Sequence, residues 1–299
     1  MQTPWGECEV ADAHVHFFSQ RFFAAFGEHL QMPAADVAAK LKWEAPPDDP
    51  RELARRWAAE LDSHGVARAA LIASVPEDEA STMAAVVAYP DRFFAFAMID
   101  PLSHSGVEDA ELVRGLHAIC LFPAMHRYSI QDKRVDVLLE QAAAHQCAVF
   151  VHCGVLSVGV RKKLGLPSPF DMRYSNPIDL QVVALRHPKV RFIVPHFGAG
   201  YFRETLMLAD LCLNVYLDTS SSNSWMRYEG LDLATVFRRA LSVVGPSRLL
   251  FGSDSSFFPR GWNHEIVEVQ TRALHELGIG EADARQILGG NLRRILTEF

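Results

Sequence analysis

Histidine side chains at the end of an early apolar run are the first sign of chemistry in this sequence. His14 and His16 stand two residues apart where a strand should end. Residues i and i+2 of a strand face the same side, so both imidazoles can bind one metal ion. A pair of surface or core histidines explains an isolated His-x-His motif equally well. The choice between these interpretations therefore depends on the rest of the chain.

Three more residues whose side chains can bind a metal ion end apolar runs far downstream. His152, His196 and Asp254 each close a run of strand length. Imidazole nitrogen and carboxylate oxygen suit zinc or manganese, and a hydrolytic site leaves one position open for water. Each residue alone is more often an ordinary polar strand end. Their common position favours one metal site, with ligands His14, His16, His152 and Asp254.

His196 is the predicted catalytic partner of this site. The small residues Gly198, Ala199 and Gly200 follow it and would let a substrate approach closely. The pKa of histidine lies near neutral pH, so His196 could act as a general base or as an electrostatic clamp. Asp254 could share the proton transfer while it contacts the metal. The alternative for His196 is a fifth ligand or a support for a ligand.

The elements that must position these residues follow a repeating pattern. Strand-length apolar runs alternate with amphipathic helical runs, which predicts an α/β fold with a parallel sheet, and eight units of this size predict a (β/α)₈ TIM barrel. A doubly wound open sheet is the alternative, but His-Val-His stands where its Gly-rich turn would be. The predicted strands are 9–16, 67–75, 93–100, 118–122, 148–152, 191–196, 215–219 and 248–254, and the main predicted helices are 50–64, 132–145, 177–186, 231–244, 263–277 and 282–296.

The composition predicts one soluble, cytoplasmic domain over residues 1–299. The hydrophobic fraction of 49% can fill a large core, and the net charge of -7 comes without clustered Lys and Arg. Nucleic acid and anionic membranes are therefore not expected as partners. No apolar run has the length of a membrane span, and no leader pattern is present. The cysteines, five in number, lie mostly in apolar runs, so disulfides are not implied.

Two long connections, 17–49 and 154–176, follow strand ends and would hang over the mouth of a barrel as lids or substrate walls. Plain structural insertions are the alternative. We predict that Arg161, Arg173 and Trp225 bind a small carboxylated substrate by bidentate pairing and ring contact. Further candidates, considered only as a group, are Arg127, His126, Arg260, Phe17, Phe18, Phe257 and Trp262.

In the order of its motifs the chain resembles the amidohydrolase superfamily, and within it the amidohydrolase-related branch (amidohydrolase 2) of aminocarboxymuconate semialdehyde decarboxylase and the resorcylate-type decarboxylases. The resemblance implies a distorted barrel with one divalent ion, Zn²⁺ first and Mn²⁺ second, on the four ligands above, with His196 beside it. It also suggests a homodimer. The segments that carry the resemblance are 14–16, 151–154, 176–188, 195–198, 214–220 and 250–254.

Two-metal members of the superfamily use a carboxylated lysine at the end of the fourth strand. This chain has Cys120 in that region, which cannot form the bridge, so a single metal is expected. Cys120 itself is better explained as a core residue, because free cysteine is usually buried.

The predicted function is that of a metal-dependent hydrolase, which directs a metal-activated water at the carbonyl of a lactone, ester or amide. A nonoxidative metal-dependent decarboxylase of an aromatic or muconate-type acid is the alternative, because the branch contains both activities. A metal-free lactonase and a catalytically silent barrel that only binds a partner remain further alternatives.

Overall fold

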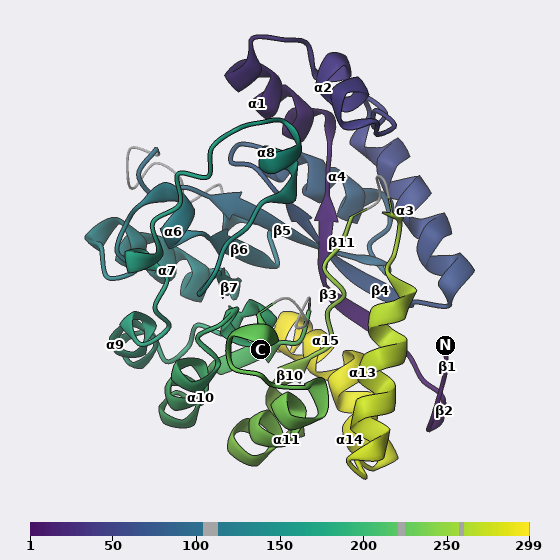
Figure 1. Cartoon of the computed structure of the whole chain (residues 1–299), viewed down its shortest axis with the longest axis vertical. Helices are drawn as coiled ribbons and strands as arrows, with labels where there is room; N and C mark the ends of the chain where they lie inside the picture. Colours follow the sequence, from purple (N-terminus) through teal and green to yellow (C-terminus); the bar gives the residue numbers. More distant parts are fainter. Residues whose placement is uncertain (104–112, 221–224, 257–259, 299) are drawn as a thin grey trace.

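A ring of parallel strands forms the centre of the computed structural model, which describes residues 1–103, 113–220, 225–256 and 260–298. The strands lie side by side in chain order and each pairs in parallel with the next, as Figure 1 shows. This arrangement confirms the predicted α/β class and the distorted barrel. The strands are β3 (Ala11–Phe17), β4 (Arg68–Ala73), β5 (Phe93–Ile99), β6 (Ala118–Leu121), β7 (Ala148–Val151), β8 (Phe192–Val194), β9 (Val215–Asp218) and β10 (Leu249–Leu250).

The eighth strand is interrupted, and its two parts close the ring. β10 pairs with β9, whereas β11 (Ser255–Ser256) pairs with β3 on the opposite edge. Between them, the carbonyl of Phe251 accepts a hydrogen bond from the N–H of Ala13 at 2.8 Å. The prediction of one continuous strand over 248–254 is therefore wrong. The chain bends at Asp254, whose φ of 57° is incompatible with an extended strand.

The barrel strands are buried on both faces, which explains their nearly continuous apolar sequences. All residues of β5 are buried, with Phe94, Phe96 and Met98 in one apolar cluster and Ala95 and Ala97 in another. The first cluster fills the inside of the ring, and the second packs under the helices. Cys120 belongs to the first cluster and is fully buried, as expected for a core thiol.

Helices return the chain from one strand to the next around the outside of the ring (Figure 1). The best predicted is the first of them, which begins at Pro50 after the N-cap Asp49 and ends before Gly65, where φ is 68°. These helices are α3 (Pro50–His64), α4 (Glu79–Ala88), α6 (Pro123–His126), α7 (Lys133–Ala144), α9 (Asp179–Arg186), α10 (Phe202–Leu211), α11 (Leu233–Val244) and α13 (His264–Glu276).

The C-terminal helix predicted over 282–296 is broken into three parts. α14 (Glu281–Arg285) and α15 (Asn291–Thr297) flank a π-turn over Gln286–Gly290. A side chain at Gly289 would lie 2.9 Å from the backbone nitrogen of Ala11, so the turn passes the first strand at close range. At the other end, β1 (Gln2–Thr3) and β2 (Gly6–Glu7) form a small hairpin.

The two long connections pack against each other. The first contains α1 (Gln20–Leu30) and α2 (Ala34–Leu41), and the second contains α8 (Gly159–Lys163) and a short turn at Met172–Tyr174. Phe22 and Leu41 from the first share one apolar cluster with Val160 and Leu164 from the second. We call these two connections together the cap. Among the described residues, no helix is both long and apolar enough to cross a membrane.

We expect Gly252→Ala to lower the free energy of unfolding by about 2–4 kcal/mol, as measured by chemical denaturation. A Cβ at this position would overlap the Asp218 carboxylate and lie 2.9 Å from Cβ of Ser220. Gly280→Ala is the control, because nothing lies within 4 Å of a Cβ there, and its loss should stay below about 1 kcal/mol. Equal losses at the two positions would contradict the packing explanation.

Candidate metal centre

A cavity of about 980 Å³ opens at the C-terminal ends of the barrel strands. All of the residues predicted at strand ends contribute to its wall, so the fold brings together side chains that are far apart in the sequence. They are His14, His16, His152, His196 and Asp254.

Three of these side chains are spaced for a shared metal ion. Nε2 of His16 lies 3.1 Å from Oδ1 of Asp254, and Nε2 of His14 lies 3.6 Å from the same oxygen. Nearest donor atoms of the three residues all lie within 4.8 Å of one another, which suits an ion with ligand distances of about 2.1 Å. No other group of histidine, cysteine or acidic residues has this spacing in the part of the chain that the structure describes.

His152 lies in the same wall but is not one of these closely spaced residues. Its ring stacks on Phe122 with centroids 5.4 Å apart and meets the His196 ring edge-on at 5.3 Å. Only 4% of the residue is exposed, and Nδ1 has no hydrogen-bond partner among the described residues. The imidazole is therefore buried beside His14, His16 and Asp254, and its Nδ1 is unpartnered among the described residues.

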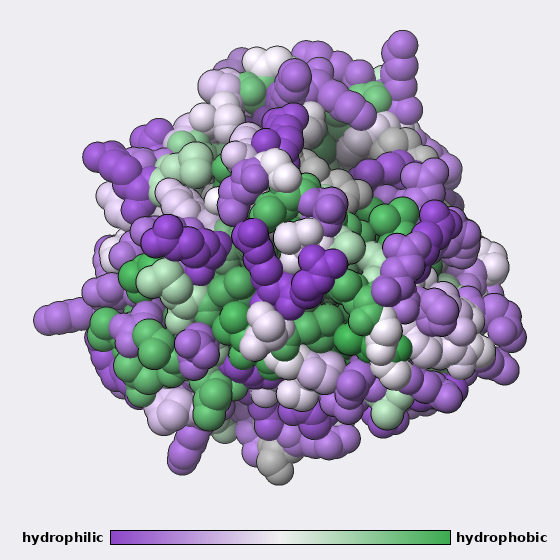
Figure 2. Space-filling model, turned by 60° about the horizontal axis from the view of Figure 1, so that its bottom comes forward, coloured by the Kyte–Doolittle hydropathy of each residue, from purple (hydrophilic) through white to green (hydrophobic). Residues whose placement is uncertain are grey.

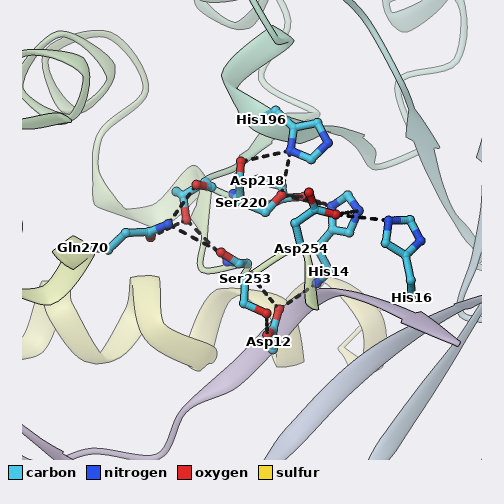
Figure 3. Close-up of polar contacts among 11 residues, drawn as sticks. Asp12, His14, His16, His196, Asp218, Ser220, Ser253, Asp254 and Gln270 are labelled. Atoms are coloured by element: carbon cyan, nitrogen blue, oxygen red, sulfur yellow. Dashed lines mark hydrogen bonds and ion pairs between the residues drawn. The ribbon is translucent and has the colours of Figure 1, made fainter. Parts of the chain in front are cut away.

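Polar side chains orient the rings of both His14 and His16, as Figure 3 shows for His14. Nδ1 of His14 lies 2.7 Å from Oδ2 of Asp218, and Nδ1 of His16 lies 2.7 Å from Oγ of Ser74. With Nδ1 held in this way, Nε2 of each ring points toward Asp254. Sequence reasoning missed Asp218 and Ser74, although both stand at strand ends like the predicted ligands.

Ser220 links His14 to His196. Its hydroxyl lies 3.0 Å from Nδ1 of each ring and donates to Asp218, while its carbonyl oxygen lies 2.9 Å from Nδ1 of His196 (Figure 3). A carbonyl oxygen can only accept, so Nδ1 of His196 carries the proton and Nε2 remains an acceptor in the neutral ring. The serine was not predicted as a site residue.

Burial and charge set different protonation states in this cluster. Burial, reinforced by the neighbouring histidines, lowers the pKa of His152 and of His196, so both rings are neutral at neutral pH. Burial also disfavours a charged Asp254, but a hydrogen bond from His16 and the nearby imidazoles outweigh it and hold the pKa of Asp254 well below its usual range. For His14, the attraction of Asp218 outweighs burial and raises the pKa.

A second buried carboxylate, that of Asp12, fixes the backbone on both sides of the site. Oδ1 of Asp12 accepts hydrogen bonds from the N–H of His14 at 2.9 Å and of Ser253 at 3.0 Å. Oδ2 accepts from the hydroxyl of Ser253 and, at 2.8 Å, from Nε1 of Trp262. Burial raises the pKa of Asp12 to about 6, although these hydrogen bonds lower it. Trp262 is thus a buried support and does not line the cavity.

The backbone adopts a rarely populated conformation at and beside the two catalytic candidates. φ is 55° at His196, 51° at Phe197 and 45° at Ala199, so the chain makes a left-handed turn just after β8. Asp254 is left-handed as well. Non-glycine residues rarely adopt this region, and such strain is concentrated at functional sites.

The outer cavity holds some of the predicted substrate contacts. Arg161 lines it half-buried, donates to the carbonyl of Pro167 and lies 5.9 Å from the Phe170 ring, without a carboxylate partner among the described residues. Trp225 also lines the cavity, and 2% of its surface is exposed. Arg173 is not in the lining; its side chain is 84% exposed and pairs with Asp171. His126, Arg260 and Phe18 also line the cavity, Arg127 and Phe17 do not, and Phe257 lies outside the described residues.

Comparison with known proteins shows which protein family the sequence matches. The family model described as Amidohydrolase matches residues 11–297. Among curated proteins, protein fluG of Emericella nidulans is 34% identical over 85 residues, which are 28% of this chain and 10% of that protein. The chain therefore spans only a small part of this relative.

Solved structures of similar fold include both decarboxylases and a hydrolase. The 5-carboxyvanillate decarboxylase of Sphingomonas paucimobilis has a TM-score of 0.64 at 15% identity, over 97% of this chain and 99% of that one. A probable 2-pyrone-4,6-dicarboxylic acid hydrolase of Acinetobacter baumannii, with citric acid bound, has 0.62 at 14%, over 96% and 99%. A dihydroxybenzoic acid decarboxylase of Polaromonas sp. JS666, with manganese and 2-nitroresorcinol bound, has 0.58 at 16%, over 97% of each. At these identities the likeness establishes the fold alone.

We expect Asp12→Asn to lower the free energy of unfolding by about 2–4 kcal/mol, because an amide nitrogen cannot accept from the buried donors around it. In the double variant with Trp262→Phe, which removes one of these donors, the loss should be smaller than the sum of the single losses by at least about 0.5 kcal/mol. Asp62→Asn, at a side chain that is 65% exposed, serves as the control and should cost less than about 1 kcal/mol. Strict additivity of the two buried changes in denaturation experiments would contradict this account.

Proposed function

The chain belongs to the amidohydrolase family, and from this premise we propose that it is a metal-dependent hydrolase of a small, carboxylated substrate. The reaction is attack of water on the carbonyl of a lactone, ester or amide. The observation that carries the proposal is the spacing of His14, His16 and Asp254 within one cavity at the strand ends. We further propose that residues 1–299 act as one catalytic domain, with the cap as part of its substrate wall.

The donor set fits a divalent ion, for which His14, His16 and Asp254 would be ligands and His152 the fourth. A ligating histidine usually has its second nitrogen held by a carboxylate, hydroxyl or carbonyl, and Asp218 and Ser74 hold His14 and His16 in this way. The neutral, buried ring of His152 is the form that binds metals. Zn²⁺ is our first choice for this chain and Mn²⁺ the second, since both accept these ligands. When bound, such an ion supplies a Lewis acid that polarises a carbonyl and lowers the pKa of water.

His196 would then move the proton, with Asp254 beside it. The anchored Nδ1 of His196 leaves Nε2 free to accept a proton from the attacking water, and the low pKa of the ring keeps Nε2 unprotonated at neutral pH. The carboxylate of Asp254 stays charged and can stabilise the imidazolium that forms. The proton is then passed on to the leaving oxygen or nitrogen as the single bond between that atom and the carbonyl carbon breaks.

The carboxylate of the substrate would pair with Arg161, whose guanidinium has no carboxylate partner among the described residues. Trp225 would contact the body of the substrate. Arg173, which sequence analysis placed in the same role, is left out of this proposal because its guanidinium already pairs with Asp171 outside the cavity lining. His126 and Arg260 remain available at the cavity wall for further polar contacts.

A carboxy-lyase is the second candidate, favoured by the aromatic side chains of the cavity. Phe18, Phe122, Phe170 and Trp225 line it and would suit a planar ring. In this reaction the bond between the ring carbon and the carboxyl carbon breaks, carbon dioxide leaves, and a proton taken from the solvent and passed on by His196 takes its place on the ring carbon. The same ligands would hold the ion.

We expect Asp254→Asn and His152→Ala each to abolish both metal retention and turnover, because each removes a ligand. His196→Ala should keep the metal and lose turnover by at least about 100-fold, the usual contribution of a general base. Metal content by plasma mass spectrometry and circular dichroism on the same samples distinguish ligand loss from unfolding. Less than about a tenth of an equivalent of divalent ion in the unaltered protein, purified without chelator, would remove the metalloenzyme proposal, and full turnover in His196→Ala would remove that residue from catalysis.

The two candidate reactions predict different products from one screen. We expect hydrolysis of at least one carboxylated lactone, ester or amide, with acid release and no carbon dioxide. Aromatic and muconate-type acids, assayed in parallel for carbon dioxide, are the test of the second candidate. Carbon dioxide release above about one turnover per second, the low end of typical enzymes, would replace the hydrolase with the carboxy-lyase.

A further inference from the structure

A second polar pair in the cavity wall, Asp100 and His126, has no part in the proposed reaction. Asp100 directly follows β5, and His126 is the last residue of α6. The exposed apolar side chains that gather over α9 and α10, on the left of Figure 2, do not line the cavity; Val182 and Met207 are examples. The pair, unlike these side chains, is within reach of a bound substrate.

The two side chains of the pair face each other. Nδ1 of His126 lies 3.9 Å from Oδ1 of Asp100, and this nitrogen is buried without a hydrogen-bond partner among the described residues. The carboxylate is held in place, because the same oxygen accepts a hydrogen bond from the N–H of Leu102 at 2.9 Å. The imidazole is stacked on the ring of Tyr128, with centroids 6.5 Å apart. The separation of 3.9 Å is long for a hydrogen bond, but the charge of the carboxylate still acts on the ring.

The Asp100 carboxylate selects the form of the imidazole. Burial lowers the pKa of His126, although the carboxylate opposes this, so the ring is neutral at neutral pH. A neutral imidazole carries its proton on one nitrogen and accepts at the other. Since a carboxylate attracts an N–H and repels a lone pair, the proton lies on Nδ1. The ring lines the cavity while Nδ1 is buried, so it meets the cavity with the edge that carries the accepting Nε2.

The position of His126 is fixed relative to the candidate metal centre. The N–H of His126 donates to the carbonyl of Phe122 at 3.1 Å, so the two side chains lie one helical turn apart on the same face. Phe122 also lines the cavity, and its ring stacks on the candidate ligand His152. A substrate that reacts at the metal centre can therefore extend along Phe122 to His126.

The cap places Arg161 beside the same stretch of wall. The guanidinium of Arg161 lies 5.9 Å from the ring of Phe170. The next residue, Asp171, donates its N–H to the carbonyl of Ala124 on α6 at 2.8 Å. Phe170 is therefore held against the helix that carries His126, and Arg161 and His126 border one part of the cavity.

Charge distinguishes these two polar positions. Arg161 has no carboxylate partner among the described residues and attracts an anion. A carboxylate bound at His126 would lie beside Asp100 and be repelled by it. Arg134 also acts on Asp100, but it does not line the cavity and pairs with Asp132 at 2.8 Å. The position at His126 therefore suits an uncharged hydrogen-bond donor.

We infer that His126, oriented by Asp100, accepts a hydrogen bond at Nε2 from an uncharged O–H or N–H group of the substrate. His126 is then a binding residue that selects the substrate, and Asp100 is a positioning residue. The inference deepens the proposed function and rests on it for the carboxylate at Arg161. The substrate class it describes has a carboxylate at one position and a neutral donor at another.

Binding of benzoate and its meta- and para-substituted derivatives to the full chain, measured by isothermal titration calorimetry, tests the role of His126. In at least one series the hydroxymethyl derivative should bind about three- to tenfold more tightly than benzoate, as one hydrogen bond allows, and the methoxymethyl derivative, which cannot donate, should lose this gain. His126→Phe should abolish the gain, whereas His126→Gln, which keeps an acceptor, should retain part of it. His29→Phe, the same change at an exposed histidine of the lining, is the control and should retain all of it. No gain in either series, or a gain that survives His126→Phe, overturns the inference.

Isophthalate and terephthalate, which carry a second carboxylate at the same ring positions, test the role of Asp100. Neither should bind the unaltered protein more tightly than benzoate does. Asp100→Asn removes the charge and keeps the shape, so it should raise the affinity for at least one of the two by about threefold or more and reduce the hydroxymethyl gain. A purely structural effect would not raise one affinity while it lowers another. Unchanged affinity for both dicarboxylates in Asp100→Asn contradicts the positioning role.

Arg161→Gln separates this inference from the proposed function. It should weaken binding of all the monocarboxylate probes by a similar factor and leave the hydroxymethyl gain in place. Unchanged affinities in Arg161→Gln would remove the carboxylate anchor of the proposed function, whereas the result with His126→Phe would still decide the role of His126.

Discussion

The carboxylate of Asp12 is the interaction on which the rest of the site depends, because it joins the first strand of the barrel to the last. Its oxygens accept hydrogen bonds from the backbone of His14 on one side and from the backbone and hydroxyl of Ser253 on the other. The candidate ligands His14 and Asp254 are therefore placed by the same buried group that helps to close the ring. A shift between the two strands would separate the ligands, so closure of the barrel and assembly of the centre are one event.

A second layer of buried polar groups orients the histidine rings of the site. Asp218 and Ser220 orient the rings of His14 and His196 through hydrogen bonds. Gln270 on α13 fixes the same strand end, because its side-chain amide accepts from the hydroxyl of Thr219 and donates to the carbonyl of Thr219. Because these groups are buried, each hydrogen bond is strong and an unmade one is costly. That layer holds the left-handed turn at His196, where the ring must face the cavity despite an unfavourable backbone.

Periodicity and strand ends predicted the barrel and the polar residues at the strand ends that line the cavity, because a parallel strand buried on both faces has a nearly continuous apolar sequence. His14, His16, His152, His196 and Asp254 were found by this logic. The break between β10 and β11 was not, since it depends on a backbone angle at Asp254 that no side-chain pattern encodes. Asp12 and Asp218 were missed as supports, and Trp262 was grouped with ring-contacting residues, because which partner a buried polar group meets is decided by tertiary packing.

The shared apolar cluster of the two connections in the cap has a consequence for how specificity can change. Phe22 and Leu41 of one connection lie in the same buried apolar cluster as Val160 and Leu164 of the other. Replacing one connection by itself would remove apolar side chains against which the other connection packs. New substrate ranges on this barrel would thus arise through paired changes in segments more than a hundred residues apart, and a chimera should exchange 17–49 and 154–176 together.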